Sequence, residues 1–193
     1  MLNVYGYHST PEQLPGYNEQ TKIIPKLAYL SAVEINKRYP EAEPYIMRDP
    51  MYAYMYATYV IKGRWPEAEP YIMKHPWYTS LYAKNVIRGR WPEAEPIIMT
   101  HPNFAFPYAK YVIKGRWPEA EPAILKDPHY ALRYARDVLK DRWPEAEPNI
   151  MTHPKYAFNY ARDIIKGRWP EAESAIERDP DNWVYYKEMF LNA

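Results

Sequence analysis

The sequence of 193 residues contains no cysteine, which excludes disulfide bonds, thiol catalysis and metal sites with cysteine ligands. It also has no apolar run near the roughly 18 residues that a membrane helix needs, so we expect no membrane segment. The first residues, MLNVYGYHST, lack a basic start followed by a long apolar stretch, so we expect no secretory signal. Together these absences favour a cytoplasmic protein.

Signs of catalysis are equally scarce. Only six glycines are present, and they form no glycine-rich loop for phosphate binding. Ser31, Ser80 and Ser174 have no His and Asp at matching positions that would build a catalytic triad. The net charge of +1 gives no overall attraction to nucleic acid or to anionic membranes. We therefore predict a protein that is not an enzyme and has no cofactor or small-molecule substrate.

What the sequence does contain is one motif written six times. RWPEAE, or RYPEAE in the first copy, recurs every 26 residues without a gap. A fixed period of this length indicates tandem structural repeats. The 21 prolines follow the same period, so they do not indicate disorder. The six copies begin at Arg38, Arg64, Arg90, Arg116, Arg142 and Arg168.

The second half of each repeat has the pattern of a helix. We number the places within a repeat from its arginine, place 1. Places 12 and 13, Asp49 and Pro50 in the first copy, suit the N-cap and the first residue of a helix. Gly63 at place 26 suits a left-handed end. The residues between them that share one side of a helical wheel, and that we predict to face the core, are Tyr52, Ala53, Tyr56, Ala57, Val60 and Ile61.

A shorter helix is predicted to precede this one in every copy. In the second copy Pro66 suits the helix start, and Glu67 and Glu69 suit its positive N-terminal end. Pro70 forgoes one backbone hydrogen bond, so we expect a distorted first turn. Trp65, just ahead of Pro66, is expected to pack back on this helix.

The predicted fold is therefore all-α, an α-solenoid of six helix-turn-helix repeats. Its predicted parts are an N-terminal cap with a half-repeat (residues 1–37), five tandem repeats (38–167) and a C-terminal capping repeat (168–193), in one continuous domain. Within the cap, STPEQL from Ser9 suits a helix start. A half-repeat helix is expected from Pro25 to Asn36.

Two departures from the regular pattern need an interpretation. His75, His101 and His153 replace the aspartate of place 12. A metal ion would need two or three of them about 2 Å away, but helices of neighbouring repeats are about 10 Å apart, so we interpret them as turn residues. Pro107 lies inside the second helix of the third copy, where we expect a kink or a late start.

The segment YARDVLKDRWPEAEP, from Tyr134 to Pro148, resembles the short α-helical tandem repeats of tailed-phage proteins and related metagenomic sequences. Those repeats carry Ile and Gly where this segment has Leu139 and Asp141. The resemblance extends from Arg38 to about Asp179. It implies a helical repeat and a viral setting, in the host cytoplasm or in the virion, and it supplies no catalytic residues.

The copies differ at only a few places, and these differences are the best indication of function. The first two copies are apolar there, whereas later copies carry polar residues such as His129, Arg133 and Asn159. A helical wheel predicts that the early set is exposed, and an exposed aromatic cluster favours a protein partner or self-association. The alternative is that residues 1–21 cover it. The predicted partner-binding residues are Tyr45, Met51, Tyr54, Met55, Tyr59, Tyr71, Trp77 and Leu81.

A second hypothesis is the binding of single-stranded nucleic acid. A basic residue that recurs among aromatic residues could follow a phosphate backbone. Other cations, such as Lys62 and Arg88, end the second helices, and we expect glutamates of the next repeat, such as Glu67 and Glu93, to neutralise them. The predicted basic stripe consists of Lys84, Lys110, Arg136, Arg162 and Lys187.

Overall fold

The computed structural model describes residues 24–192, and all of the regular secondary structure in this part of the chain is helical. Helical units that recur with the period of the sequence motif pack against one another. The predicted all-α tandem-repeat fold is therefore confirmed. The predicted helix start at Ser9 and the predicted cover by residues 1–21 lie outside the described residues. The chain divides into two compact units, Met1–Ile97 and Ile98–Ala193.

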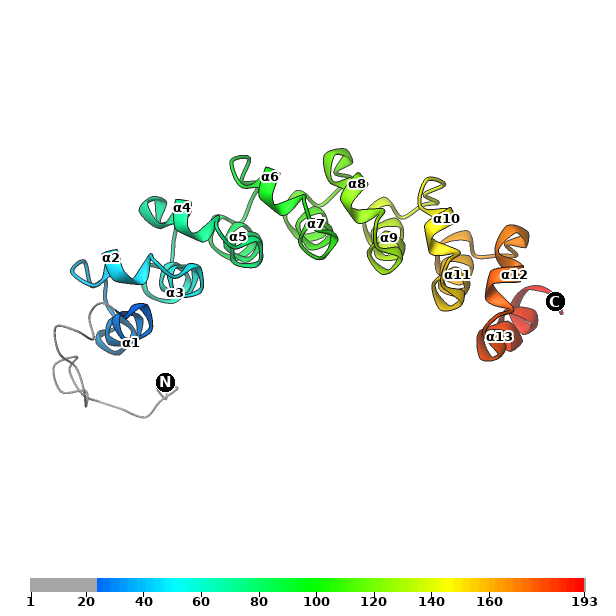
Figure 1. Cartoon of the computed structure of the whole chain (residues 1–193), viewed down its shortest axis with the longest axis horizontal. Helices are drawn as coiled ribbons and strands as arrows, with labels where there is room; N and C mark the ends of the chain where they lie inside the picture. The colour runs from blue at the N-terminus through cyan, green and yellow to red at the C-terminus, as the bar shows by residue number, and fades with distance from the viewer. Residues whose placement is uncertain (1–23, 193) are drawn as a thin grey trace. The chain divides into compact units, whose positions relative to one another are not determined.

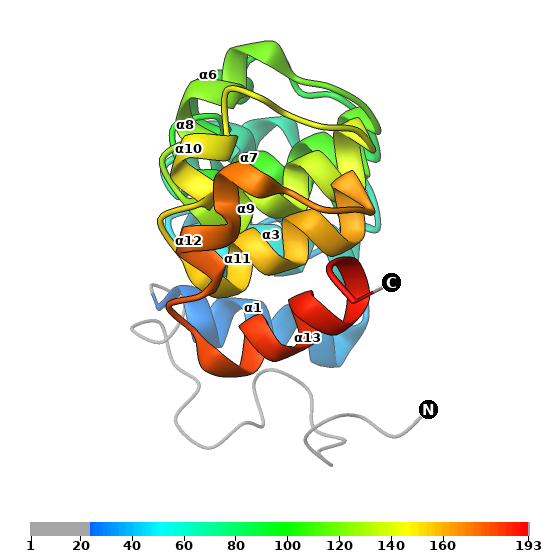
Figure 2. The ribbon, with the colours of Figure 1, turned by 90° about the vertical axis from the view of Figure 1, so that its right-hand side faces the viewer.

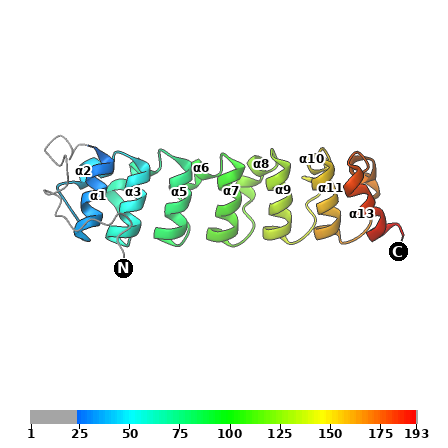
Figure 3. The same cartoon turned by 90° about the horizontal axis from the view of Figure 1, so that it is seen from below.

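In the first unit, two short helices form one layer and three longer ones form the other (Figure 1). The longer helices α1, α3 and α5 pack side by side, as Figure 3 shows from below. The elements are α1 (Pro25–Ile35), α2 (Glu43–Ile46), α3 (Pro50–Tyr56), η3 (Ala57–Ile61), η4 (Pro66–Ala68), α4 (Glu69–Ile72), α5 (Pro76–Tyr82) and η5 (Ala83–Ile87); α6 (Glu95–Ile98) reaches the unit boundary.

The second unit repeats this arrangement. Its longer helices α9, α11 and α13 are neighbours in Figures 2 and 3. The elements are α7 (Pro102–Tyr108), η6 (Ala109–Ile113), η7 (Pro118–Ala120), α8 (Glu121–Ile124), α9 (Pro128–Tyr134), η8 (Ala135–Leu139), α10 (Glu147–Ile150), α11 (Pro154–Tyr160), η9 (Ala161–Ile165), η10 (Pro170–Ala172), α12 (Glu173–Ile176) and α13 (Pro180–Phe190).

A hydrogen-bonded cluster explains why the motif is invariant. In the second copy Arg64 holds both carboxylate oxygens of Glu69, at 2.7 and 3.0 Å. The Tyr82 hydroxyl donates to the same carboxylate at 3.2 Å and accepts the backbone N–H of Trp65 at 2.6 Å. Glu69 therefore ties the two helices of a repeat together, which the dipole argument alone did not predict. The tyrosines that donate to the motif glutamate in this way include Tyr56, Tyr82, Tyr134, Tyr160 and Tyr186.

Trp65 joins neighbouring repeats. Its ring is only 1 % exposed and lies 5.0 Å, centroid to centroid, from the ring of Tyr56 in the preceding repeat. Trp117 packs in the same way against Tyr108 at 5.1 Å. A motif that carries this tryptophan therefore supplies a link within its repeat and a link to the repeat before it.

The second helices end differently from the prediction. After Tyr56 the backbone widens into the π-helical turn η3, and the left-handed residue that ends it is Lys62, with φ of 59°. Gly63, which we predicted for this role, is not left-handed, and a side chain there would meet open space. The basic residues in the left-handed conformation are Lys62, Arg88, Lys114, Lys140 and Lys166.

The short helices begin as expected, with a distorted turn. Residues Pro66–Ala68 form a turn of 3-10 helix before α4, as do Pro118–Ala120 before α8. Of the two outcomes expected at Pro107, a kink or a late start, the late start is wrong, because α7 begins at Pro102 like its counterparts. Helical hydrogen bonding is present past Pro107, where the N–H of Ala109 reaches the carbonyl of Ala105.

Candidate functional site

The candidate site lies on the second helices of the first unit. Met51, Met55 and Tyr59 follow one another at intervals of four residues, so they share one side of α3 and η3. Trp77 and Leu81 occupy the matching side of α5. Tyr59 is 58 % exposed and Trp77 is 47 % exposed, while the other three side chains are half-buried. We call these five residues the apolar face.

Tyr54 does not belong to this face, and the prediction that it is exposed is wrong. Its side chain is 9 % exposed, its ring lies 6.2 Å from that of Tyr78, and its hydroxyl accepts a hydrogen bond from the Asn85 amide at 2.7 Å. Both partners belong to the next repeat. Place 17 therefore faces the neighbouring second helix, and the corresponding Phe106 and Leu132 are buried as well.

Tyr45 and Tyr71 also lie apart from the apolar face. They belong to the short helices α2 and α4, in the other layer of the unit (Figure 1). Each is half-buried, and a cation of its own repeat lies over its ring: Arg48 at 5.1 Å from the Tyr45 centroid and Lys74 at 4.8 Å from that of Tyr71. Of the eight predicted residues, the structure places five on one surface.

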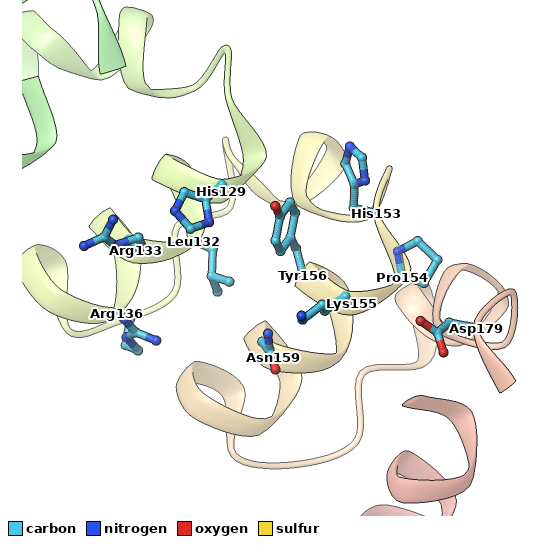
Figure 4. Close-up of a pocket in the computed structure, with 10 residues that line it drawn as sticks. All are labelled: His129, Leu132, Arg133, Arg136, His153, Pro154, Lys155, Tyr156, Asn159 and Asp179. Carbon is cyan, nitrogen blue, oxygen red and sulfur yellow. The ribbon is translucent and has the colours of Figure 1, made fainter. Parts of the chain in front are cut away.

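On α9 and α11 of the second unit the corresponding places are polar, whereas α13 carries the exposed Tyr185 and Met189 there. His129 and Arg133 of α9, with Lys155 and Asn159 of α11, occupy the positions of the apolar side chains, around a hollow of about 550 Å³ (Figure 4). The helices that carry them have the same length, seven residues, as α3 and α5. The fold therefore does not require apolar side chains at these places.

The basic stripe is largely neutralised in the second unit. Lys110 and Arg136 both bind Asp137, at 2.8 Å each. Arg162 binds Asp163 at 2.6 Å, and Arg136 also lies 3.7 Å from that carboxylate. Burial alone would raise the pKa of Asp137, but hydrogen bonds from Arg136 and Lys110 hold it below its usual value. These aspartates directly follow Arg136 and Arg162 in the sequence, a signal that sequence reasoning missed.

The expected neutralisation at the ends of the second helices is not found. The charge of Glu67 instead contributes to Arg38. The pKa of Arg38 is raised mainly by its hydrogen bond to Glu43, and the negative charge of Glu67 raises it further. Lys62 and Arg88 form no ion pair with any residue in the range 24–192.

Within the described residues, no three side chains of His, Asp or Glu come together as a metal site would require. The rings of His75 and His153 instead lie against Tyr78 and Tyr156, at 4.9 and 5.2 Å. None of the helices in this part of the chain is both long enough and apolar enough to cross a bilayer. No protein-family model, curated protein or solved structure matches the chain.

Proposed function

We propose that the protein is a non-catalytic helical-repeat module that binds a protein partner through the apolar face. The observation that carries this proposal is the contrast between copies. Trp77 is 47 % exposed on a helix whose counterpart α11 carries Lys155 at the same place. Exposed aromatic and methionine side chains that gather on one surface are typical of interfaces, and aromatic residues dominate their binding energy.

The setting of this binding is proposed from the resemblance to phage repeats. A phage-encoded module of this kind would bind a host factor or a component of a defence system, or would take part in the virion. The host cytoplasm and the virion are accordingly the proposed locations.

The ion pairs of the second unit count against the nucleic-acid alternative. A phosphate backbone that followed the basic stripe would meet the carboxylates of Asp137 and Asp163, which already bind Lys110, Arg136 and Arg162. Phosphate binding also weakens steeply with salt, whereas contacts through apolar side chains persist. Retention of the partner at high salt therefore favours the apolar face.

The double variant Trp77→Ser with Leu81→Ser tests the proposal. Trp77 is exposed and Leu81 is half-buried, so we expect the circular dichroism spectrum to stay the same and the melting temperature to fall modestly, chiefly through Leu81→Ser. Capture of a partner from a bacterial host lysate should fall at least tenfold, since each interface aromatic contributes about 2 kcal/mol or more.

The matched control is Lys155→Ser with Asn159→Ser, which changes the same two places in the second unit. A protein captured equally by the wild type and this control, and lost with the apolar double variant, supports the proposal. Equal capture by all three contradicts it. If light scattering showed that the wild type is a dimer and the apolar double variant a monomer, the partner would be a second copy of the protein.

A further inference from the structure

A groove lies at the end of the apolar face, between the π-helical turns η3 and η5. Its volume is about 480 Å³. The exposed ring of Tyr59 stands on one side, and the cations Lys62 and Arg88 belong to its lining. The full set of lining residues is Ala57, Thr58, Tyr59, Lys62, Gly63, Asn85, Val86 and Arg88.

The second unit contains the corresponding groove between η6 and η8, with a volume of about 270 Å³. It has the same aromatic residue, Tyr111, and the same pair of left-handed cations, Lys114 and Lys140. It differs in holding a carboxylate of its own, Asp137, which Lys110 binds at 2.8 Å.

The first groove lacks this internal carboxylate. Asn85 takes the place of Asp137, and Thr58 takes the place of Lys110. None of the described residues that line the first groove is acidic, and Lys62 and Arg88 have no ion-pair partner within residues 24–192. Within residues 24–192 the Arg88 side chain makes one polar contact, a long one of 3.5 Å to the Asn85 carbonyl.

The backbone of the two cations does not distinguish the grooves. Lys62 and Arg88 have φ of 59°, and Lys114 and Lys140 have φ of 60° and 57°. The left-handed residue is part of the helix end in both grooves, so the contrast between them lies in their side chains and volumes.

We propose that the groove between η3 and η5 binds a carboxylate of the partner protein, from an acidic extended segment. The carboxylate lies between Lys62 and Arg88, and the ring of Tyr59 packs against the neighbouring part of the segment. A carboxylate is the occupant because the only charged side chains that line this groove are the two cations Lys62 and Arg88, and neither has an ion-pair partner within residues 24–192. This inference rests on the proposed function in that the partner is a protein, but it uses different side chains from Trp77 and Leu81.

Fluorescence anisotropy with a labelled peptide of ten glutamates tests the inference, using the full-length protein in low salt. Lys62→Gln with Arg88→Gln should weaken binding about tenfold, because two charge-assisted contacts are lost. The matched control, Lys114→Gln with Lys140→Gln, should change binding less than about twofold, since that groove is smaller and the Asp137 carboxylate in its lining repels the glutamates of the peptide. The variant Asp137→Asn should add a second binding site.

The variant Trp77→Ser with Leu81→Ser separates this inference from the proposed function. It should bind the glutamate peptide as the wild type does, even though it loses the captured partner. Equal peptide binding by the two glutamine double variants would overturn the inference. Tighter binding of a labelled ten-nucleotide thymidylate, lost with Lys62→Gln and Arg88→Gln, would assign the groove to nucleic acid instead.

Discussion

At the scale of single residues, each repeat depends on one buried tyrosine. The Tyr134 hydroxyl donates to Glu121 at 3.2 Å and accepts the N–H of Trp117 at 2.6 Å, with no exposed surface. Burial raises the pKa of Tyr134 to about 12. The neutral hydroxyl is thus favoured in the folded state, because the phenolate would lose its donor and would face a carboxylate.

Because of this tyrosine, the unfolding free energy should fall as the pH rises through the alkaline range. An unfolded tyrosine ionises near pH 10, whereas folded Tyr134 has a pKa of about 12. Its contribution is therefore complete below about pH 10 and is lost as the pH rises toward 12. We expect urea unfolding at pH 11 to show a loss of roughly 1 kcal/mol for each such tyrosine relative to pH 9. An unfolding free energy that stays constant from pH 9 to pH 11 would contradict the role of the cluster.

At the scale of helices, the sequence predicted the repeats, the order of short and long helices and the core-facing residues of place 16, such as Ala53. It did not predict that Tyr54 is buried, because a wheel describes one helix, whereas place 17 packs against the next repeat. Comparison of the copies could have predicted this burial, because Phe106 and Leu132 are also apolar at place 17, and both are buried. The π-helical turns were not predicted, because each is only five residues long and the spacing of apolar residues in so short a segment is the same as in an α-helix.

The left-handed ends of the second helices offer a direct stability test. Lys140 has φ of 57°, so Lys140→Gly should relieve strain and raise the unfolding free energy by about 1 kcal/mol, part of the relief being offset by the greater flexibility of unfolded glycine. Thermal or urea unfolding measures this change. The adjacent control Asp141→Gly should give no gain, because Asp141 is not left-handed and its carboxylate accepts the N–H of Arg142 at 2.7 Å. If Asp141→Gly raised the unfolding free energy and Lys140→Gly did not, the assignment of the left-handed helix end to Lys140 would be wrong.

At the scale of the whole chain, the two compact units share one set of structural residues and differ in the outer surface of their second helices. The unit boundary, between Ile97 and Ile98, falls inside α6 and follows none of the repeat starts seen in the sequence. Comparison among the copies singled out the five residues of the apolar face because these places vary between copies, whereas the residues of the hydrogen-bonded cluster do not. That they bind a partner stays a prediction. The groove beside this face was not predicted, since it arises where turns of two repeats meet.

The most direct test of the apolar face is photo-crosslinking in cells. A photoreactive benzoylphenylalanine replaces Trp77 in one variant and Lys155, at the same place of the second unit, in another. Both positions are exposed, so both substitutions should leave the fold intact. We expect irradiation to attach another protein to position 77 and none to position 155. Crosslinks that form at position 155 and not at position 77 would contradict the assignment of partner binding to the apolar face.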